Sequence, residues 1–210
     1  MRTDPRPHVY LLDDDPDVRH AVTFLLETEG HSVIAFDTAE SLLGAVNADC
    51  RGCLVLDVRL PGMTGLELQE KLGDQGIAMP ILFISGHGDI PMAVRAINAG
   101  AMDFIEKPFR DELLLQKVAD GLAADETQAE RRSRRDSLEE RLSRLTPRER
   151  EVMEAMLEGK LNKVIADDLN VSPRTVEVHR ARVLEKLEAR NSSDMVRLVL
   201  STDSYRDWIN

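Results

Sequence analysis

Short apolar runs alternate with helical patterns over residues 1–124 of this 210-residue chain. Five runs are predicted as strands because they are short, apolar and bounded by turn signals. They are His8–Leu12, Ser32–Phe36, Cys53–Leu56, Ile81–Ser85 and Asp103–Ile105. In the segments between and after them, apolar residues recur three and four positions apart, which predicts helices. Strands that alternate with helices imply βαβ crossovers, so we expect an α/β domain with a doubly wound, five-stranded parallel sheet.

Residues 125–144 follow a different pattern, because almost every position is polar and neither proline nor glycine occurs. This composition predicts a charged helical linker with opposite charges along its surface. Leu138, Leu142 and Leu145 form a short apolar stripe at helical spacing. We favour packing of this stripe on the domain that follows. A seam between two helices of a dimer is the alternative, although the stripe is too short to specify a coiled coil.

Residues 145–210 carry the start and stop signals of four helices. The predicted helices begin at Thr146-Pro147, Asn162, Ser172-Pro173 and Asn191-Ser192-Ser193. A tight turn at Asn170-Val171 joins the second and third, which is the pattern of a helix-turn-helix. The predicted core of this motif is Val164, Ile165, Leu169, Val171, Val176, Val183, Leu184 and Leu187. The chain is therefore predicted to be α/β in residues 1–124 and all-α in residues 145–210.

Charge is distributed unevenly within a net charge of −11. Residues 1–124 hold 20 acidic and 10 basic residues, whereas residues 125–210 hold 18 and 17. Any contact with nucleic acid must therefore come from a local arrangement of cations in the second half. Aromatic residues make up only 4%, which argues against a single-strand-binding platform. No apolar run is as long as a membrane span and no signal-peptide core follows the N-terminus, so we expect a cytoplasmic protein without a membrane partner.

The two cysteines, Cys50 and Cys53, have the C-x-x-C spacing of redox pairs. They flank the entry to a predicted buried strand, where no helix N-terminus activates a thiol, and no second ligand cluster completes a zinc site. We therefore expect Cys53 to be a small core residue and Cys50 a loop residue.

Charged side chains follow several of the predicted strands. Asp13 and Asp14 follow the first strand, Asp57 the third and Lys107 the fifth. The carboxyl ends of parallel strands lie at one edge of a sheet, so these groups should converge there. Crowded carboxylates favour a cation between them, and magnesium or manganese prefers oxygen ligands. We expect Asp13, Asp14, Asp57 and the backbone carbonyl of Arg59 as ligands.

In this arrangement Asp57 can act as a nucleophile and form an aspartyl-phosphate. The metal and Lys107 would neutralise charge on the transferring phosphoryl group, and Ser85 would donate a hydrogen bond to it. Each residue alone is also explained by a turn or a helix cap. Their joint occurrence at the ends of four strands favours the phosphoryl site.

Four motifs carry a family resemblance along residues 7–124. They are Leu-Leu-Asp13-Asp14-Asp15, Leu-Asp57-Val-Arg-Leu-Pro61-Gly62-Met-Thr-Gly65, Ile-Ser85-Gly86-His87-Gly88-Asp89 and Glu106-Lys107-Pro108-Phe109. In this order they resemble the receiver domain of two-component response regulators. The resemblance implies that a sensor histidine kinase phosphorylates Asp57. It also implies that Ser85 and Gly86 bind the phosphoryl group, while Phe104 changes position with Ser85.

The resemblance further implies that phosphorylated receivers pair through a surface that includes the fourth helix. Met92, Val94 and Arg95 are the candidates there. Phe104 stands where many relatives have tyrosine, so its inward movement would be driven by packing alone. Arg59 and His87 are expected to tune slow self-dephosphorylation.

The third helix of the second half is a candidate for DNA recognition. Its predicted exposed residues are Arg174, Thr175, Glu177, Val178, His179, Arg182 and Lys186. Arginine can contact guanine or phosphate, Val178 a thymine methyl group, and Glu177 a cytosine amino group. Lys163 and Ser172 lie at helix starts, where they suit phosphate contacts. A run of charges on a helix is, however, often only a solvent-exposed face without a binding role.

Three motifs add a second resemblance, namely Leu145-Thr-Pro-Arg-Glu-Arg-Glu-Val, Asn162-Lys163-Val-Ile-Ala166 and Ser172-Pro-Arg-Thr-Val-Glu-Val-His179-Arg. With Leu184-Glu-Lys-Leu187 they resemble the LuxR-type helix-turn-helix, and the whole chain is similar to the NarL/FixJ class of response regulators, most of all its FixJ-like branch. The resemblance implies a phosphorylation-dependent transcription activator that forms a homodimer on promoter DNA and contacts RNA polymerase. Val196, Val199 and Leu200 of the fourth helix are candidates for pairing, or for the core.

Two alternatives remain. An aspartyl-phosphate hydrolase would act on small substrates, but such enzymes often carry a second aspartate two residues after the nucleophile, where this chain has Arg59. The tail could instead bind RNA or protein. We expect no enzyme activity beyond slow self-phosphorylation and dephosphorylation at Asp57.

Overall fold

Five parallel strands form one sheet in the first part of the chain, whose computed structural model describes residues 7–86, 90–205 and 208. The strands are β1 (His8–Leu12), β2 (Val33–Phe36), β3 (Gly52–Asp57), β4 (Ile81–Ser85) and β5 (Asp103–Glu106). Their order in the sheet is β2-β1-β3-β4-β5. Each strand agrees with its prediction to within one residue at either end, and the predicted doubly wound α/β architecture is confirmed.

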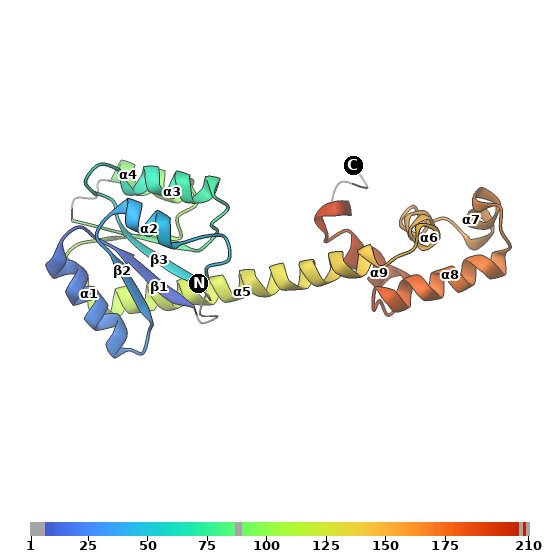
Figure 1. Ribbon diagram of the computed structural model, residues 1–210, viewed down its shortest axis with the longest axis horizontal. Helices are drawn as coiled ribbons and strands as arrows, with labels where there is room; N and C mark the ends of the chain where they lie inside the picture. Colours follow the sequence, from blue (N-terminus) through green and yellow to red (C-terminus); the bar gives the residue numbers. More distant parts are fainter. Residues whose placement is uncertain (1–6, 87–89, 206–207, 209–210) are drawn as a thin grey trace. The chain divides into compact units, whose positions relative to one another are not determined.

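Helices cover both faces of this sheet (Figure 1). They are α1 (Pro16–Thr28), α2 (Ala39–Ala45), α3 (Gly65–Asp74), α4 (Ile90–Asn98) and α5 (Asp111–Ser143). Helix α1 begins with proline at its first position, after Asp15 has capped it by accepting from the backbone N–H groups of Asp17 and Val18. Helices α1 and α5 pack on one face, and α2, α3 and α4 on the other.

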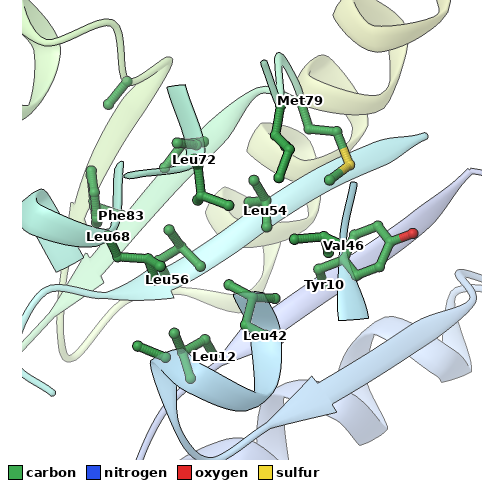
Figure 2. Close-up of a cluster of buried hydrophobic side chains, with 14 of the residues drawn as sticks. Tyr10, Leu12, Leu42, Val46, Leu54, Leu56, Leu68, Leu72, Met79 and Phe83 are labelled. Atoms are coloured by element: carbon green, nitrogen blue, oxygen red, sulfur yellow. The ribbon is translucent and has the colours of Figure 1, made fainter. Parts of the chain in front are cut away.

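Successive strand residues point to opposite faces, which produces two separate cores. On one face Leu12, Leu54, Leu56 and Phe83 pack against helices α2 and α3, as Figure 2 shows. The other core contains Leu11 and its neighbours on β3 and β4, packed against α1 and the first turns of α5. The central strands β3 and β4 are buried along their whole length, which explains why they appear in the sequence as unbroken apolar runs.

The two cysteines take up the positions expected of them. Cys53 is fully buried in β3, Cys50 is half-buried in the preceding loop, and both are free thiols. Burial raises the pKa of the Cys53 thiol to about 12, so this residue is protonated and unreactive.

Short helices build the second part of the chain. They are α6 (Pro147–Leu157), α7 (Asn162–Leu169), α8 (Pro173–Lys186) and α9 (Ser192–Val199), followed by the 3₁₀ turn η1 (Asp203–Tyr205). Thr146 caps α6 in a capping box with Glu149, and Ser172 caps α8. Asn170 adopts a left-handed conformation with φ of 53°, which lets the chain turn between α7 and α8. The predicted all-α helix-turn-helix region is confirmed.

Helix α5 continues through the charged stretch without a break. Its last turns belong to the second core, where Leu138, Leu142 and Leu145 pack among residues of α6 to α9. The favoured interpretation of this leucine stripe is therefore confirmed. The chain divides into two units, residues 1–128 and 129–210, and each is described by itself. The domain limits at 124 and 144 stay predictions.

The burial of four residues either differs from the prediction or decides between the predicted alternatives. Val164 was expected in the helix-turn-helix core but is 43% exposed. Helix α7 has only eight residues, and Ile165 and Ala166 supply its buried side. Val199 is fully buried, so it is unavailable for pairing, whereas Val196 and Leu200 are half-buried.

Among the described residues, every helix is too short or too polar to cross a bilayer.

Candidate functional site

The carboxyl edge of the sheet brings Asp13 and Asp57 together. Leu12 pairs with Leu56 in the parallel register of β1 and β3, so the residues that follow each of them come next to one another. Asp13 is completely buried and Asp57 is 7% exposed. Two neighbouring carboxylates at such depth repel one another unless a positive charge lies close by.

Lys107 supplies one such charge from the loop after β5. Its Nζ donates to Oδ2 of Asp13 at 2.6 Å and to Oδ2 of Asp57 at 2.7 Å. The Lys107-Pro108 peptide bond is cis. Lys107 lies 50 residues from Asp57 and 94 residues from Asp13 in the sequence. The three residues nevertheless meet in one hydrogen-bonded group, as predicted.

The pKa values in this group show that its charges are incompletely balanced. Burial raises the pKa of Asp13, and the hydrogen bonds from Lys107 lower it without cancelling the rise. Burial by itself lowers the pKa of Lys107, but its hydrogen bonds to the two carboxylates outweigh this and raise it. Lys107 therefore stays cationic, while one ammonium group serves two carboxylates.

Asp14 completes an acidic cluster at this edge. Carboxylate oxygens of Asp13, Asp14 and Asp57 all lie within 4.8 Å of one another, and Asp14 is exposed to solvent. The other oxygen of Asp57, Oδ1, accepts a hydrogen bond from the backbone N–H of Arg59 at 2.8 Å. The loop after β3 thus lies against the cluster, as predicted. The role of the Arg59 carbonyl stays a prediction.

The predicted switch residues lie on the next two strands. Ser85 is fully buried at the end of β4, and Gly86 follows it in an exposed turn. Phe104 pairs with Phe83 across β4 and β5 and is half-buried against the core beneath α3 and α4. His87 lies outside the described residues.

Gly65 has a role in this site that residue chemistry alone does not reveal. A Cβ atom at this position would lie 2.6 Å from the carbonyl oxygen of Asp57 and 2.9 Å from the Phe83 ring. Only glycine lets the start of α3 approach the end of β3 this closely. Gly65 therefore permits this close approach, and its N–H donates to the carbonyl oxygen of Val58 at 2.8 Å.

Helix α4 presents an apolar stripe that only partly matches the predicted pairing residues. Val94 and Arg95 are exposed, whereas Met92 is half-buried against the core, and the pairing role of all three stays a prediction. Ile90 is 81% and Ile97 is 44% exposed, and both were missed. Residues 90, 94 and 97 share one side of the helix, so helical spacing was the signal that could have found them.

Helix α8 exposes one continuous side. After Pro173, which is exposed at its first position, its exposed residues are Arg174, Glu177, Val178, Ala181, Arg182 and Glu185, which follow helical spacing. Ala181 and Glu185 were missed because neither has the chemistry usually sought in a DNA contact. Thr175 and His179 flank this side and are half-buried. Lys163 and Ser172 are exposed at or near the starts of α7 and α8.

Lys186 differs from its predicted role on the exposed face of α8. Its Nζ donates to Oε2 of Glu149 at 2.6 Å and to the carbonyl oxygen of Arg144 at 3.1 Å. Glu149 is only 2% exposed. Burial alone would raise the pKa of Glu149, but hydrogen bonds from Lys186 and Thr146 outweigh it and lower the pKa to about 2. Lys186 thus forms an ion pair with a buried carboxylate.

Comparison with known proteins agrees with this division of the chain. Residues 9–119 match the family model of the response regulator receiver domain, and residues 143–199 match that of bacterial regulatory proteins of the luxR family. The chain therefore belongs to the response regulators that join a receiver to a LuxR-type DNA-binding domain. Proteins of this class are phosphorylation-dependent transcriptional regulators, and so is this chain.

Within that class the chain is FixJ-like. It is 40% identical to the transcriptional regulatory protein FixJ of Bradyrhizobium diazoefficiens over 95% of this chain and 98% of the relative. It is 44% identical to the response regulator protein TodT of Pseudomonas putida over 90% of this chain and 84% of the relative. These relatives are regulatory proteins rather than enzymes, which removes the hydrolase alternative.

Solved structures lead to the same conclusion. The response regulator StyR is 42% identical, with a TM-score of 0.82 over 92% of this chain and 98% of that one. Full-length FixJ from B. japonicum is 40% identical, with a TM-score of 0.57 over 93% of this chain and 97% of that one.

Proposed function

We propose that Asp57 accepts a phosphoryl group from a sensor histidine kinase and that this modification controls DNA binding by the second unit. One observation carries the proposal. A single ammonium group, that of Lys107, lies between two buried carboxylates, Asp13 and Asp57, at 2.6 and 2.7 Å. The site is therefore short of positive charge and is open to a cation at its exposed residue, Asp14.

The proposed reaction joins Asp57 to a phosphoryl group that the kinase carries on a histidine. A carboxylate oxygen of Asp57 attacks the phosphorus of a phosphohistidine on the kinase. The new O–P bond forms as the N–P bond breaks, and the released imidazole takes up a proton. Lys107 remains protonated, because its pKa is raised, and its ammonium group faces the negative charge of the phosphoryl oxygens.

The acidic cluster fits a magnesium or manganese ion. Its donors are all oxygens within 4.8 Å of one another, close to the span of about 4.2 Å between opposite oxygens around magnesium. The raised pKa of buried Asp13 also indicates a shortage of positive charge. Asp13, Asp14, Asp57 and the Arg59 carbonyl would hold the ion. When bound, it supplies positive charge to the transferring phosphoryl group.

Phosphorylation of Asp57 would change the positions of Ser85 and Phe104. Ser85 ends the strand beside β3, and its hydroxyl would donate to a phosphoryl oxygen on Asp57. Phe104 lies one strand further and would move inward into the core as Ser85 shifts. We propose that this change alters α4, whose exposed Ile90, Val94 and Ile97 then pair with a second receiver, with Arg95 at the margin.

In the second unit, α8 would enter the major groove of double-stranded promoter DNA. Its exposed side would contact the base edges through Arg174, Glu177, Val178 and Arg182. Lys163 and Ser172, at or near two helix starts, would contact phosphates. Thr175 and His179 would contribute from the flanks. Two such units in a dimer would bind half-sites about one helical turn apart.

We further propose that the protein activates transcription in the cytoplasm through contact with RNA polymerase. An activator needs such a contact once dimerisation has placed it on promoter DNA. Run-off transcription from a bound promoter tests this: phosphorylated protein should raise the yield, and repression would refute the proposal.

Phosphoryl uptake is the direct test of the receiver proposal. The full chain is treated with acetyl phosphate and magnesium, and its intact mass is measured. We expect one added phosphoryl group on the wild-type chain, none on Asp57→Asn, and one on the control Asp74→Asn, whose aspartate lies at the exposed end of α3. Equal uptake by Asp57→Asn would refute the assignment of Asp57.

A further inference from the structure

A charge pair between a buried glutamate and a partly buried lysine joins three elements of the second unit. The ammonium group of Lys186, in the last turn of α8, bonds to Glu149 near the start of α6 and to the carbonyl of Arg144 just after α5. Glu149 Oε2 also accepts from the backbone N–H of Thr146 at 2.8 Å. Every one of these bonds is charge-assisted and is therefore stronger than a hydrogen bond between neutral groups.

A second contact reaches the same helix end from α5. Arg141 donates to the carbonyl oxygen of Leu187 at 3.4 Å, and its guanidinium pairs with Glu188 at 2.9 Å. Glu188 is more than two thirds exposed, so the Arg141 pair is weak, whereas the Glu149 side chain is 3% exposed. Lys186 is thus the main polar attachment of the C-terminal end of α8.

Apolar packing holds α8 in the core through fully buried residues that include Val176 and Val183. Hydrophobic burial is non-directional, so it specifies no single polar partner for the helix. A hydrogen-bonded ion pair tolerates little displacement, because a displaced ammonium group would leave the Glu149 carboxylate buried and unpaired. The pair therefore adds a polar constraint on the axial position and tilt of α8 to the constraint from packing.

We propose that Lys186 and Glu149 are a positioning pair, which sets how deeply and at what tilt α8 meets the base edges without touching DNA. The proposal rests on the proposed DNA recognition by α8. It assigns Lys186 a role opposite to that of a phosphate contact. A lysine that neutralises a phosphate contributes about 1 to the slope of log affinity against log salt concentration, and a positioning lysine contributes nothing.

The salt dependence of DNA binding separates these roles. The probe is a duplex selected from a random-sequence pool by the wild-type full chain treated with acetyl phosphate. For Lys186→Met we expect the ratio of specific to non-specific affinity to fall at least about tenfold, the size of one lost base contact, with an unchanged salt slope. For the exposed control Lys163→Met we expect a slope lower by about 1 and an unchanged ratio.

A matched double variant tests positioning against simple stabilisation. Replacing both partners, in Lys186→Met with Glu149→Met, removes the pair without leaving a buried charge, so folding should be retained. We expect its specificity ratio to stay low. The proposal would be overturned if the double variant recovered both the wild-type ratio of specific to non-specific affinity and the wild-type stability. It would also be overturned if Lys186→Met lowered the slope of log affinity against log salt concentration. If the wild-type chain selects no duplex, the proposed DNA recognition falls, and the positioning role falls with it.

Discussion

Each unit of this protein contains a partly buried lysine that is bonded to a buried carboxylate, but the two groups are balanced differently. In the receiver, Lys107 serves two carboxylates, and the pKa of Asp13 is raised. In the DNA-binding unit, Lys186 serves one carboxylate that also accepts from a backbone N–H, and the pKa of Glu149 is lowered to about 2. The same residue types thus make a reactive site where charge is unbalanced and a structural contact where it is balanced.

The largest expected effect follows from removing the shared ammonium group of the receiver. Lys107→Met should slow phosphoryl uptake from acetyl phosphate at least about 100-fold, because one fixed charge facing a reacting group contributes that much. The rate is measured by intact mass over time. The control Lys117→Met, whose lysine pairs with Asp103 away from the cluster, should keep the wild-type rate. A loss of less than about threefold for Lys107→Met would place this lysine outside the reaction.

The stability that the Lys186–Glu149 pair contributes should depend on pH more strongly than the stability contributed by exposed carboxylates. The folded-state pKa of Glu149 is about 2 against an ordinary 4.5, so its contribution to stability is complete above pH 4.5 and is lost as the pH falls towards 2. The difference corresponds to about 3 kcal/mol. Urea unfolding can be followed by the fluorescence of Trp208, the single tryptophan, which contacts Tyr205 in the second unit.

Glu149→Gln should therefore lose about 3 kcal/mol at pH 7 and show a flatter pH dependence between pH 5 and 3 than the wild-type chain. The control Glu151→Gln changes an exposed carboxylate paired with Arg148 and should follow the wild-type curve. Parallel curves for wild type and Glu149→Gln would mean that Lys186 does not stabilise the Glu149 carboxylate.

Dimerisation should depend on the apolar side of α4. Val94→Asp places a charge in the centre of the stripe, and in a symmetric dimer the change occurs twice. Phosphorylated protein should therefore dimerise at least about tenfold more weakly, since each copy loses part of the burial free energy of a valine side chain. Sedimentation equilibrium measures this, with Phe24→Ser on α1 as the exposed apolar control. Unchanged dimerisation in Val94→Asp would move the pairing surface elsewhere.

The smallest effect is expected on the charged surface of α5. Arg134 pairs with Glu130 at 3.2 Å, but both side chains are more than half exposed. Arg134→Ala should change the free energy of unfolding by less than about 0.5 kcal/mol, as exposed pairs on helices do. Urea unfolding at low salt checks this. A loss above about 1 kcal/mol would show that exposed pairs matter as much as buried ones here.

The receiver site could be predicted closely because parallel strand ends share an edge. Once β1, β3 and β5 were located, the convergence of Asp13, Asp57 and Lys107 followed from topology alone. The closeness of Gly65 to the Asp57 carbonyl could not be predicted, because it depends on how α3 approaches β3.

The helical surfaces were harder to predict, since helical spacing does not say which side is covered. Met92 and Lys186 both have exposed neighbours in sequence, yet one packs against the core and the other meets a buried carboxylate 37 residues away. The position of Val164 depends in the same way on which side of the short helix α7 meets its neighbours. Such long-range partners leave no local signal in the sequence.

The central claim is that phosphorylation of Asp57 in one unit controls DNA binding by the other. It is tested most directly by the dissociation constant of the full chain for its selected duplex, with and without acetyl phosphate and magnesium. Phosphodonor should tighten binding by the wild-type chain at least about tenfold, within the usual range of allosteric coupling, and should leave Asp57→Asn unchanged. An equal response from both proteins, or no response from the wild-type chain, would contradict the claim.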